Sequence, residues 1–409
     1  MTERSTHETR PERAAAVVIL AGVSAALHVA KLPPAIAALQ AALGISLLQA
    51  GFLLSLVQLA GMSAGVAFGV LADGLGLKRS MLVGLVLLAA ASALGAMSTA
   101  VPLLMALRAL EGFGFLLVVL PAPGLIRRLV PPQRLSRVLG LWGTYMPFGA
   151  ALALLVGPLW IGAFGWRAWW WLLAGTTLAM ALWLARVVPA TAAAAGAAAD
   201  PWWQRLRTTL SAPGPWLVAL TFAVYAGQWL AVIGFLPTIY LQAGVSGAAT
   251  GVLTALAAAV NMAGNVAGGR LLQAGVPATR LLRTGFVVMG LSAVVAFAAV
   301  DGATLPPPLR FAAVLLFSAV GGLIPSTLFS LAVKLAPSER TLSSTVGWMQ
   351  QWSAFGQFAG PPLVAWVAGR SGGWQWTWVP TGLCALLGLG LAWRIGRLLR
   401  GGMSMADNR

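Results

Sequence analysis

Residues 14–37 read AAAVVILAGVSAALHVAKLPPAIA, an apolar stretch that is long enough to cross a lipid bilayer as one helix. Two ionisable side chains, His28 and Lys31, lie three residues apart in it and therefore share one helix face. A cation in the hydrocarbon costs roughly 2.5–3.5 kcal/mol on insertion scales, so it usually faces water, a partner or a ligand. The stretch predicts a membrane-spanning helix with a functional cation.

The whole chain has the composition of an integral membrane protein. It contains 409 residues, of which 59% are hydrophobic and only 9% are charged. Soluble domains carry about 25% charged residues. Eleven further apolar segments reach the length of a span: 47–71, 80–98, 101–126, 138–160, 167–187, 215–240, 249–269, 281–300, 309–333, 342–368 and 374–395. We therefore expect an all-α integral membrane protein with twelve transmembrane helices.

Basic residues mark one side of the membrane. Of the 26 Lys and Arg residues, two lie deep inside spans (Lys31 and Arg108), and three lie in odd-numbered loops or at the span ends beside them (Arg167, Arg310 and Arg370). The other 21 fall in the tails, in the even-numbered loops or at the span ends beside these, which the positive-inside rule assigns to the cytoplasm. The sequence thus predicts a multi-pass protein of a bacterial inner membrane with both termini cytoplasmic. This topology explains the net charge of +17 and indicates no nucleic-acid partner.

One long connection divides the chain. Residues 189–214 read PATAAAAGAAADPWWQRLRTTLSAPG, a low-complexity run followed by a segment suited to a short helix on the membrane surface. We predict five parts: a cytoplasmic tail at 1–13, a six-helix bundle at 14–188, a cytoplasmic linker at 189–214, a second six-helix bundle at 215–396 and a cytoplasmic tail at 397–409.

Polar residues are distributed unevenly among the spans. Apart from Arg283 at the start of the second one, segments 80–98 and 281–300 carry nothing more polar than Ser or Thr, which is typical of outer helices that face lipid. Amide and aromatic side chains of other spans are candidates for lining a cavity: Trp142, Tyr145, Tyr225, Gln228, Asn261 and Gln350. Hydrogen bonding between helices is an alternative role for them. Most of the 18 tryptophans, Trp169 and Trp170 among them, lie near span ends and indicate an interfacial belt.

Three motifs resemble the major facilitator superfamily: GVLADGLGLKR at Gly69–Arg79, RALEGFG at Arg108–Gly114 and GWRAW at Gly165–Trp169. They fall at matching places in a twelve-span frame, so the resemblance implies two pseudo-symmetric six-helix bundles. It also implies a cytoplasmic gating loop, whose residues here are Gly69, Asp73, Gly76, Lys78 and Arg79. In that loop Asp73 and the basic pair would form a latch. The alternative is a charged turn that only sets the topology.

A looser resemblance is to the cyanate and nitroimidazole transporter branch of this superfamily. It depends on Lys31 followed by Pro33 and Pro34, and on VLGLWGTYMPFGAAL at 138–152. Members of the branch more often carry Arg where this chain has Lys31. Arg binds small oxyanions through a planar fork, whereas Lys offers a point charge. The resemblance implies a small anionic substrate, such as cyanate, nitrite or a small carboxylate.

The ionisable residues inside spans also favour an anion. Arg108 and Glu111 are spaced i,i+3, so Glu111 can neutralise Arg108 within one helix. Lys31 would then remain as an unpaired positive charge, which attracts an anion strongly where the dielectric constant is low. Two alternatives stay open: Lys31 extends to the outer headgroups, and His28 serves packing and not proton transfer. Proton coupling through His28 or Glu111 also stays open.

A secondary transporter that moves a small anion by alternating access accounts for these features best. The first alternative is an exporter of amphiphilic drug-like compounds, although such exporters usually carry more carboxylates in their inner helices. An integral-membrane transferase is less favoured, because the chain lacks the sets of His, Cys or acidic residues that catalysis or metal binding needs. The chain has no phosphate-binding loop. We expect no enzymatic activity, no cofactor, no metal and a monomeric protein.

Overall fold

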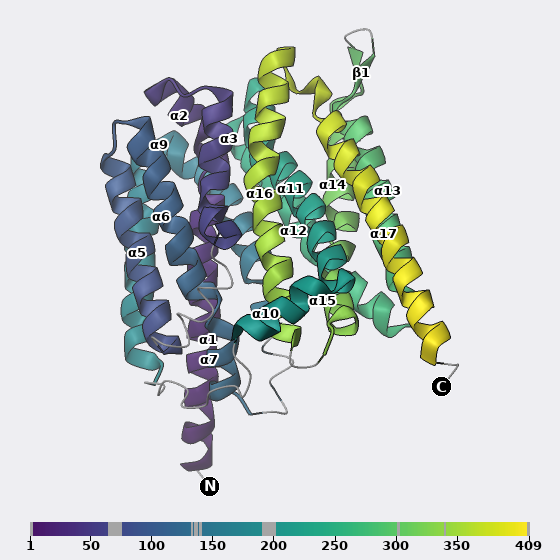
Figure 1. Cartoon of the computed structure of the whole chain (residues 1–409). Coiled ribbons are helices and arrows are strands. Elements are labelled where there is room, and N and C mark those ends of the chain that lie inside the picture. The colour runs from purple at the N-terminus through teal and green to yellow at the C-terminus, as the bar shows by residue number, and fades with distance from the viewer. Residues whose placement is uncertain are drawn as a thin grey trace. The chain divides into compact units, whose positions relative to one another are not determined.

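The computed structural model in Figure 1 describes residues 3–63, 76–131, 134, 138, 141–189, 202–300, 303–338 and 341–406, and nearly all of them are helical. The chain forms two compact units. Unit 1 comprises Met1–Ser46, Leu56–Ala197 and Leu236–Ala255, and unit 2 comprises Leu47–Ser55, Ala198–Phe235 and Leu256–Arg409. Each unit thus includes a short segment from the other half of the sequence. The five domain ranges derived above stay a prediction.

Unit 1 is built from helices of the first half of the chain. They are α1 (Glu3–Ala30), η1 (Pro33–Ala35), α2 (Ile36–Leu43), η2 (Leu56–Gln58), α5 (Leu77–Met97), α6 (Val101–Val119), α7 (Ala122–Leu129) and α9 (Tyr145–Val187). Helix α1 packs along α9, and α9 packs along α5, which in turn packs along α6. These four helices enclose the polar residues of the first span.

Unit 2 follows the same all-helical pattern. Its elements are α3 (Leu47–Ser55), α10 (Trp202–Ser211), α11 (Pro213–Gln242), α12 (Gly247–Gln273), α13 (Ala278–Phe297), β1 (Ala299–Val300), β2 (Ala303–Thr304), α14 (Pro307–Gly321), α15 (Leu323–Leu335), α16 (Leu342–Ser371), η4 (Trp374–Trp376) and α17 (Trp378–Ala406). The end of α11 and the start of α12 are assigned to unit 1. The small antiparallel pair β1–β2, with Ala299 opposite Thr304, is the one departure from the expected all-α class in the described residues.

Nine helices in the described part of the chain are long and apolar enough to cross a membrane. The longest, α9, has 43 residues and contains Gly165 with a φ of 81°, so it consists of two helices that meet at a bend. Glycine adopts this left-handed conformation at no steric cost, which is why the helices change direction there. The membrane-spanning character is confirmed, and the count of twelve spans stays a prediction.

Consecutive prolines interrupt the first span. Helix α1 ends at Ala30, a short 3₁₀ turn occupies Pro33–Ala35, and the chain becomes α-helical again at Ile36. Proline has no backbone N–H and its ring clashes with the preceding turn, so two prolines in a row stop an α-helix. Lys31 therefore lies at a break in the first span, where backbone carbonyl groups lack their usual helical partners.

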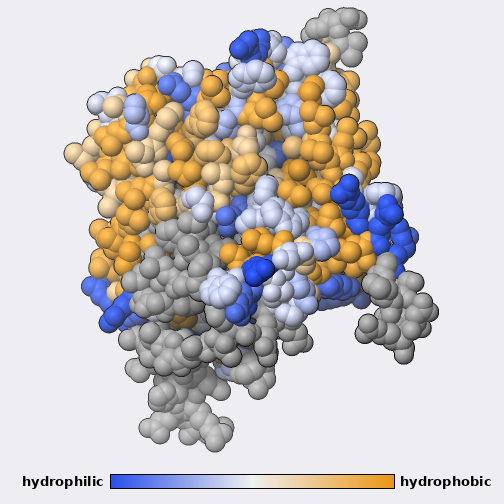
Figure 2. All heavy atoms as spheres, in the orientation of Figure 1, coloured by the Kyte–Doolittle hydropathy of each residue, from blue (hydrophilic) through white to orange (hydrophobic). Residues whose placement is uncertain are grey.

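The outer surfaces are apolar along the helices. On the face shown in Figure 2, hydrophobic side chains cover most of the middle of the helices, and hydrophilic ones gather toward helix ends. Helix α5 exposes half of Val86, and α13 exposes 64% of Leu291. Exposed large apolar residues on these two helices fit the expectation that segments 80–98 and 281–300 face lipid.

The linker segment forms helix α10, which lies across one end of the helices of unit 2 (Figure 1). The indole N–H of Trp216 on α11 donates to the Leu210 carbonyl at a distance of 2.9 Å, and this contact ties α10 to the bundle. Trp203 is half exposed on α10. The helix matches the one expected from the sequence, and its location at the membrane surface stays a prediction.

Candidate functional site

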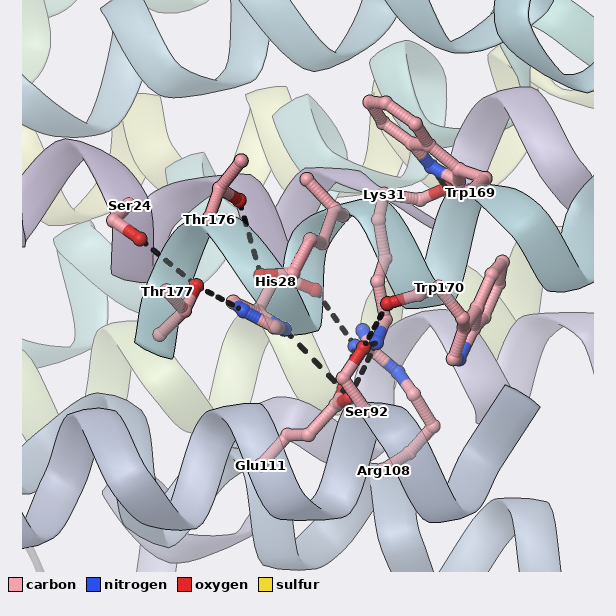
Figure 3. Close-up of polar contacts among 11 residues, drawn as sticks. Ser24, His28, Lys31, Ser92, Arg108, Glu111, Trp169, Trp170, Thr176 and Thr177 are labelled. Atoms are coloured by element: carbon pink, nitrogen blue, oxygen red, sulfur yellow. Dashed lines mark hydrogen bonds and ion pairs between the residues drawn. The ribbon is translucent and has the colours of Figure 1, made fainter. Parts of the chain in front are cut away.

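Lys31 points into the interior of unit 1. Its side chain has no exposed surface. The Lys31 ammonium donates to the Ser92 hydroxyl of α5 at 2.9 Å, forms an ion pair with Glu111 of α6, and lies 4.6 Å from the ring centroid of Trp170 on α9 (Figure 3). An aromatic face near a desolvated cation is favourable. Three helices thus provide the partners of this charge.

One carboxylate serves two cations. Oε2 of Glu111 accepts a hydrogen bond from Nη1 of Arg108 at 2.5 Å, while Oε1 contacts Lys31. The i,i+3 pair expected from the sequence is therefore present. The inference that it leaves Lys31 unpaired is wrong, because the two carboxylate oxygens divide between the two cations. The alternative of Lys31 extending to the headgroups is also wrong, since its ammonium lies inside the unit.

This buried ion cluster, defined as Lys31, Arg108 and Glu111, carries one net positive charge when all three are ionised. All three side chains are at most 1% exposed. Desolvation of such groups is costly, and their arrangement persists only with good geometry and additional hydrogen bonds. The pairing of the three groups therefore compensates part of their desolvation cost.

The broken end of α1 receives two side-chain donors. Nη1 of Arg108 donates to the His28 carbonyl at 2.7 Å, and the indole N–H of Trp169 donates to the Lys31 carbonyl at 3.1 Å. These donors replace partners that a continuous helix would have supplied. Trp169 and Trp170 are 2% and 1% exposed. The expectation that these two tryptophans belong to an interfacial belt is therefore wrong, because both pack inside unit 1.

The indole donor of Trp169 yields a testable prediction. Trp169→Phe keeps an aromatic ring in the core but removes the hydrogen bond to the Lys31 carbonyl. We expect a loss of about 1 kcal/mol in the free energy of unfolding, measured by denaturation of the purified protein in detergent. Trp171→Phe is the matched control, since Trp171 is half exposed and should tolerate the change. Equal stability of the two variants would contradict the capping role.

His28 takes part in a chain of polar contacts between α1 and α9. Its Nε2 lies 2.8 Å from Oγ1 of Thr177, and Ser24 lies 2.9 Å from the same hydroxyl (Figure 3). Its Nδ1 lies 3.7 Å from Oε1 of Glu111. His28 thus both joins helices and borders the ion cluster. Its role in proton transfer stays a prediction.

Trp142 and Tyr145 pack against each other and against α1. Their rings are stacked with centroids 4.4 Å apart, and Trp142 is 8% exposed. The Trp142 ring occupies the space beside Gly22, where any side chain on α1 would meet it. Trp142 belongs to the hydrophobic core of unit 1, and Tyr145 packs against that core. Packing accounts for their position, and contact with a substrate stays a prediction.

In unit 2 the predicted polar residues form a hydrogen-bond network. Nδ2 of Asn261 on α12 donates to the Tyr225 hydroxyl of α11 at 3.0 Å and to the Ser318 carbonyl of α14 at 2.8 Å. The Trp229 indole donates to the Ser318 hydroxyl at 3.1 Å, and Asn265 donates to Oδ1 of Asn261 at 3.0 Å. The alternative of interhelical hydrogen bonding thus describes these side chains. Ser318 was missed, because a single serine in an apolar span gives no sequence signal.

The other two amide candidates differ in exposure. Gln228 on α11 is 2% exposed, whereas Gln350 on α16 is exposed. The sequence did not single out Ser92, which bonds to Lys31, Thr177, which bonds to His28, or Ser24, which bonds to Thr177. Each is a small hydroxyl residue of an otherwise apolar span, and such residues are too common to indicate a site.

The predicted gating loop is only partly visible. Gly69 and Asp73 lie outside the described residues. Gly76 has a φ of 85° and precedes α5, Arg79 is exposed, and the Lys78 ammonium donates to the Ala185 carbonyl near the end of α9 at 2.8 Å. A cation at a helix C-terminus satisfies an unpaired carbonyl and is favoured by the helix dipole. The latch that involves Asp73 stays a prediction.

Comparison with known proteins places this geometry in context. The family model of the Major Facilitator Superfamily matches residues 16–361. A chloramphenicol resistance protein of Streptomyces lividans is 34% identical over 202 residues, which cover 47% of this chain and 50% of the relative. The matched part of the chain therefore spans about half the length of this curated relative.

Solved structures of transporters share the fold. A bacterial homologue of the human lysosomal transporter Spinster, in an inward-facing and occupied conformation, superposes with a TM-score of 0.80 at 14% identity and covers 95% of this chain and 97% of that one. The nucleoside transporter NupG, studied as a mutant, gives a TM-score of 0.77 at 12% identity over 93% and 98% of the chains. At these identities the likeness concerns the fold alone, and it confirms the expected all-α membrane architecture.

Proposed function

This chain belongs to the major facilitator superfamily and is a membrane transporter, not an enzyme, and from that premise we propose that it exports an uncharged amphiphilic compound by alternating access. The sequence left this class open as the first alternative to small-anion transport. The observation that carries it is the ion cluster. Lys31, on which the anion hypothesis depended, is engaged by Glu111, Ser92 and Trp170 inside unit 1.

The remaining candidate residues suit a neutral ligand. Gln228 and Gln350 offer amide groups, which are uncharged donors and acceptors, and the neighbouring polar pair of Tyr225 and Asn261 is uncharged as well. Apolar and aromatic surroundings with a few polar groups are the usual lining of a site for an organic compound. The likeness to a chloramphenicol resistance protein supports the same class, since chloramphenicol is an uncharged aromatic amide.

We assign the ion cluster to energy coupling. Protonation of Glu111 would remove the negative charge that holds Lys31 and Arg108 together, and His28 lies 3.7 Å from that carboxylate. A change in the charge of one group shifts the equilibrium between two conformations when that group interacts differently with each of them. In this proposal the tails and even-numbered loops are cytoplasmic, and the latch at Asp73 opens in the same cycle.

A small anion, such as cyanate, nitrite or a small carboxylate, is the second candidate. The observation that favours it is the net positive charge of the cluster, in which two cations share one carboxylate. A small anion that reached Lys31 or Arg108 would neutralise the net positive charge of the ion cluster. The Lys31–Pro33–Pro34 resemblance to cyanate transporters supports this candidate as well.

Transport by purified protein in liposomes separates the two candidates. We expect protein-dependent movement of chloramphenicol that a pH gradient accelerates, with no competition from cyanate, nitrite or acetate. Liposomes without protein serve as the control. Saturable movement of cyanate or nitrite, with no movement of chloramphenicol, would establish the second candidate instead. A thermal-shift screen gives an independent readout, because a ligand at 100 times its Kd stabilises a protein by about 2.7 kcal/mol.

A further inference from the structure

Gln228 is a buried amide for which the described residues of unit 2 supply no partner. It lies in the middle of α11 and is 2% exposed. Within the described residues, neither its amide nitrogen nor its amide oxygen forms a hydrogen bond. A glutamine side chain has two N–H donors and an acceptor oxygen. The whole hydrogen-bonding capacity of this side chain is therefore unused.

Such an arrangement is rare in folded proteins. The large majority of buried side-chain polar atoms have a protein or water partner, because a buried donor or acceptor without one bears its full desolvation cost. A long glutamine side chain has the freedom to reach neighbouring carbonyl groups on most helices. That both of its polar ends remain without partners indicates that something outside the chain completes them.

The polar side chains next to Gln228 on α11 already have hydrogen-bond partners. Tyr225, one turn earlier on α11, bonds to Asn261, and Trp229 bonds to Ser318. Helical periodicity of about 100° per residue places these two side chains about 60° and 100° to one side of Gln228. On the other side Gly227 lies against the backbone of Gly356 on α16. Gln228 thus occupies the sector between a closed polar network and a close helix contact.

From this placement we infer that Gln228 is a specificity-determining residue that binds the ligand directly, by accepting a hydrogen bond from an amide N–H of the ligand. The inference rests on the proposed export of an uncharged compound. The side-chain oxygen of Gln228 accepts from that N–H, and its NH2 group donates to a hydroxyl or carbonyl oxygen elsewhere on the ligand. The partners named here on α11, α12 and α14 are uncharged, so nothing among them favours an ionised ligand.

The test compares three full-length proteins in detergent: wild type, Gln228→Leu and the control Gln273→Leu, whose residue is exposed at the end of α12. The probes are chloramphenicol and its amide-N-methylated analogue, in which the amide donor is blocked. For Gln228→Leu we expect an apparent Tm without ligand at least equal to that of wild type, because an unpartnered buried amide is removed. We also expect its Kd for chloramphenicol to rise about 10-fold or more, a loss on the scale of one to two hydrogen bonds.

Two further comparisons sharpen the result. N-methylation should weaken binding to wild type and to Gln273→Leu, while Gln228→Leu should bind the two probes equally. An unchanged Kd in a folded Gln228→Leu protein would overturn the inference and assign an ordered water as the partner of Gln228. Absence of chloramphenicol binding by wild type would instead overturn the proposed function, which separates the two failures. Gln228→Asn, which keeps the amide on a shorter side chain, should bind chloramphenicol more weakly than wild type but still distinguish the two probes.

Discussion

Glu111→Gln is expected to destabilise the protein by about 3–5 kcal/mol, because it removes the one negative charge that Lys31 and Arg108 share in the interior of unit 1. Glutamine keeps the size of glutamate and one of its two acceptor oxygens, so the effect reports the lost charge and one lost acceptor and not a change in packing. The measurement is the apparent Tm and the denaturant midpoint of the purified protein in detergent. Expression in the membrane should fall in parallel.

Two control variants isolate the charge. Ser92→Ala removes another partner of Lys31 without changing any charge, and it should cost only about 1 kcal/mol. The double variant Lys31→Met with Glu111→Gln removes one cation together with the carboxylate and should recover part of the lost stability. Residues in one ion network show interaction energies of about 0.5–3 kcal/mol in such cycles. Strictly additive effects would show that Lys31 and Glu111 do not interact.

Gly264→Ala is expected to disrupt unit 2. Gly264 on α12 lies against the Ala319 carbonyl of α14, and a Cβ on residue 264 would overlap that oxygen. The obstacle is backbone, so it cannot move aside as a flexible side chain would. Forcing even one extra methyl group into a packed contact costs about 1–3 kcal/mol, and more where backbone must shift. The hydrogen bonds of Asn261 to Tyr225 and Ser318 would be strained together with it.

The same helix provides the control for this prediction. A Cβ added at Gly269 meets nothing within 4 Å. Gly269→Ala should therefore leave stability unchanged or raise it by about 1 kcal/mol through the better helix propensity of alanine. Size-exclusion profiles and Tm values of the two variants give the comparison. Similar behaviour of both would contradict the close approach of α12 and α14.

Local features of the site followed from sequence spacing. Arg108 and Glu111 lie on one helix, so their i,i+3 distance predicted the ion pair that the structure contains. Pro33 and Pro34 explain why segment 14–37, which was expected to cross as one helix, instead ends its first helix at Ala30. Both features depend only on the geometry of a single helix, which is nearly the same in every protein.

Contacts between helices did not follow from spacing. Lys31 and Glu111 are separated by 80 residues in the sequence. The residue pattern of one span does not predict which face of another span packs against it. The burial of Trp169 and Trp170 was missed for the same reason. Their location near a span end is typical of interfacial tryptophans, whereas the bend at Gly165 directs them to the interior of unit 1.

The sequence by itself determined that this chain is a membrane protein built from spanning helices, because hydrophobicity and span length act through the bilayer and need no tertiary contact. Its motifs resembled the major facilitator superfamily, whose family model matches residues 16–361. Only the tertiary structure decided that Lys31 shares Glu111 with Arg108, and that Gln228 lacks a partner among the described residues while Asn261 and Tyr225 have one. Pairing of buried polar groups depends on which helix faces pack together. Which helix faces pack together depends on the whole fold, so the sequence of a single segment does not predict it.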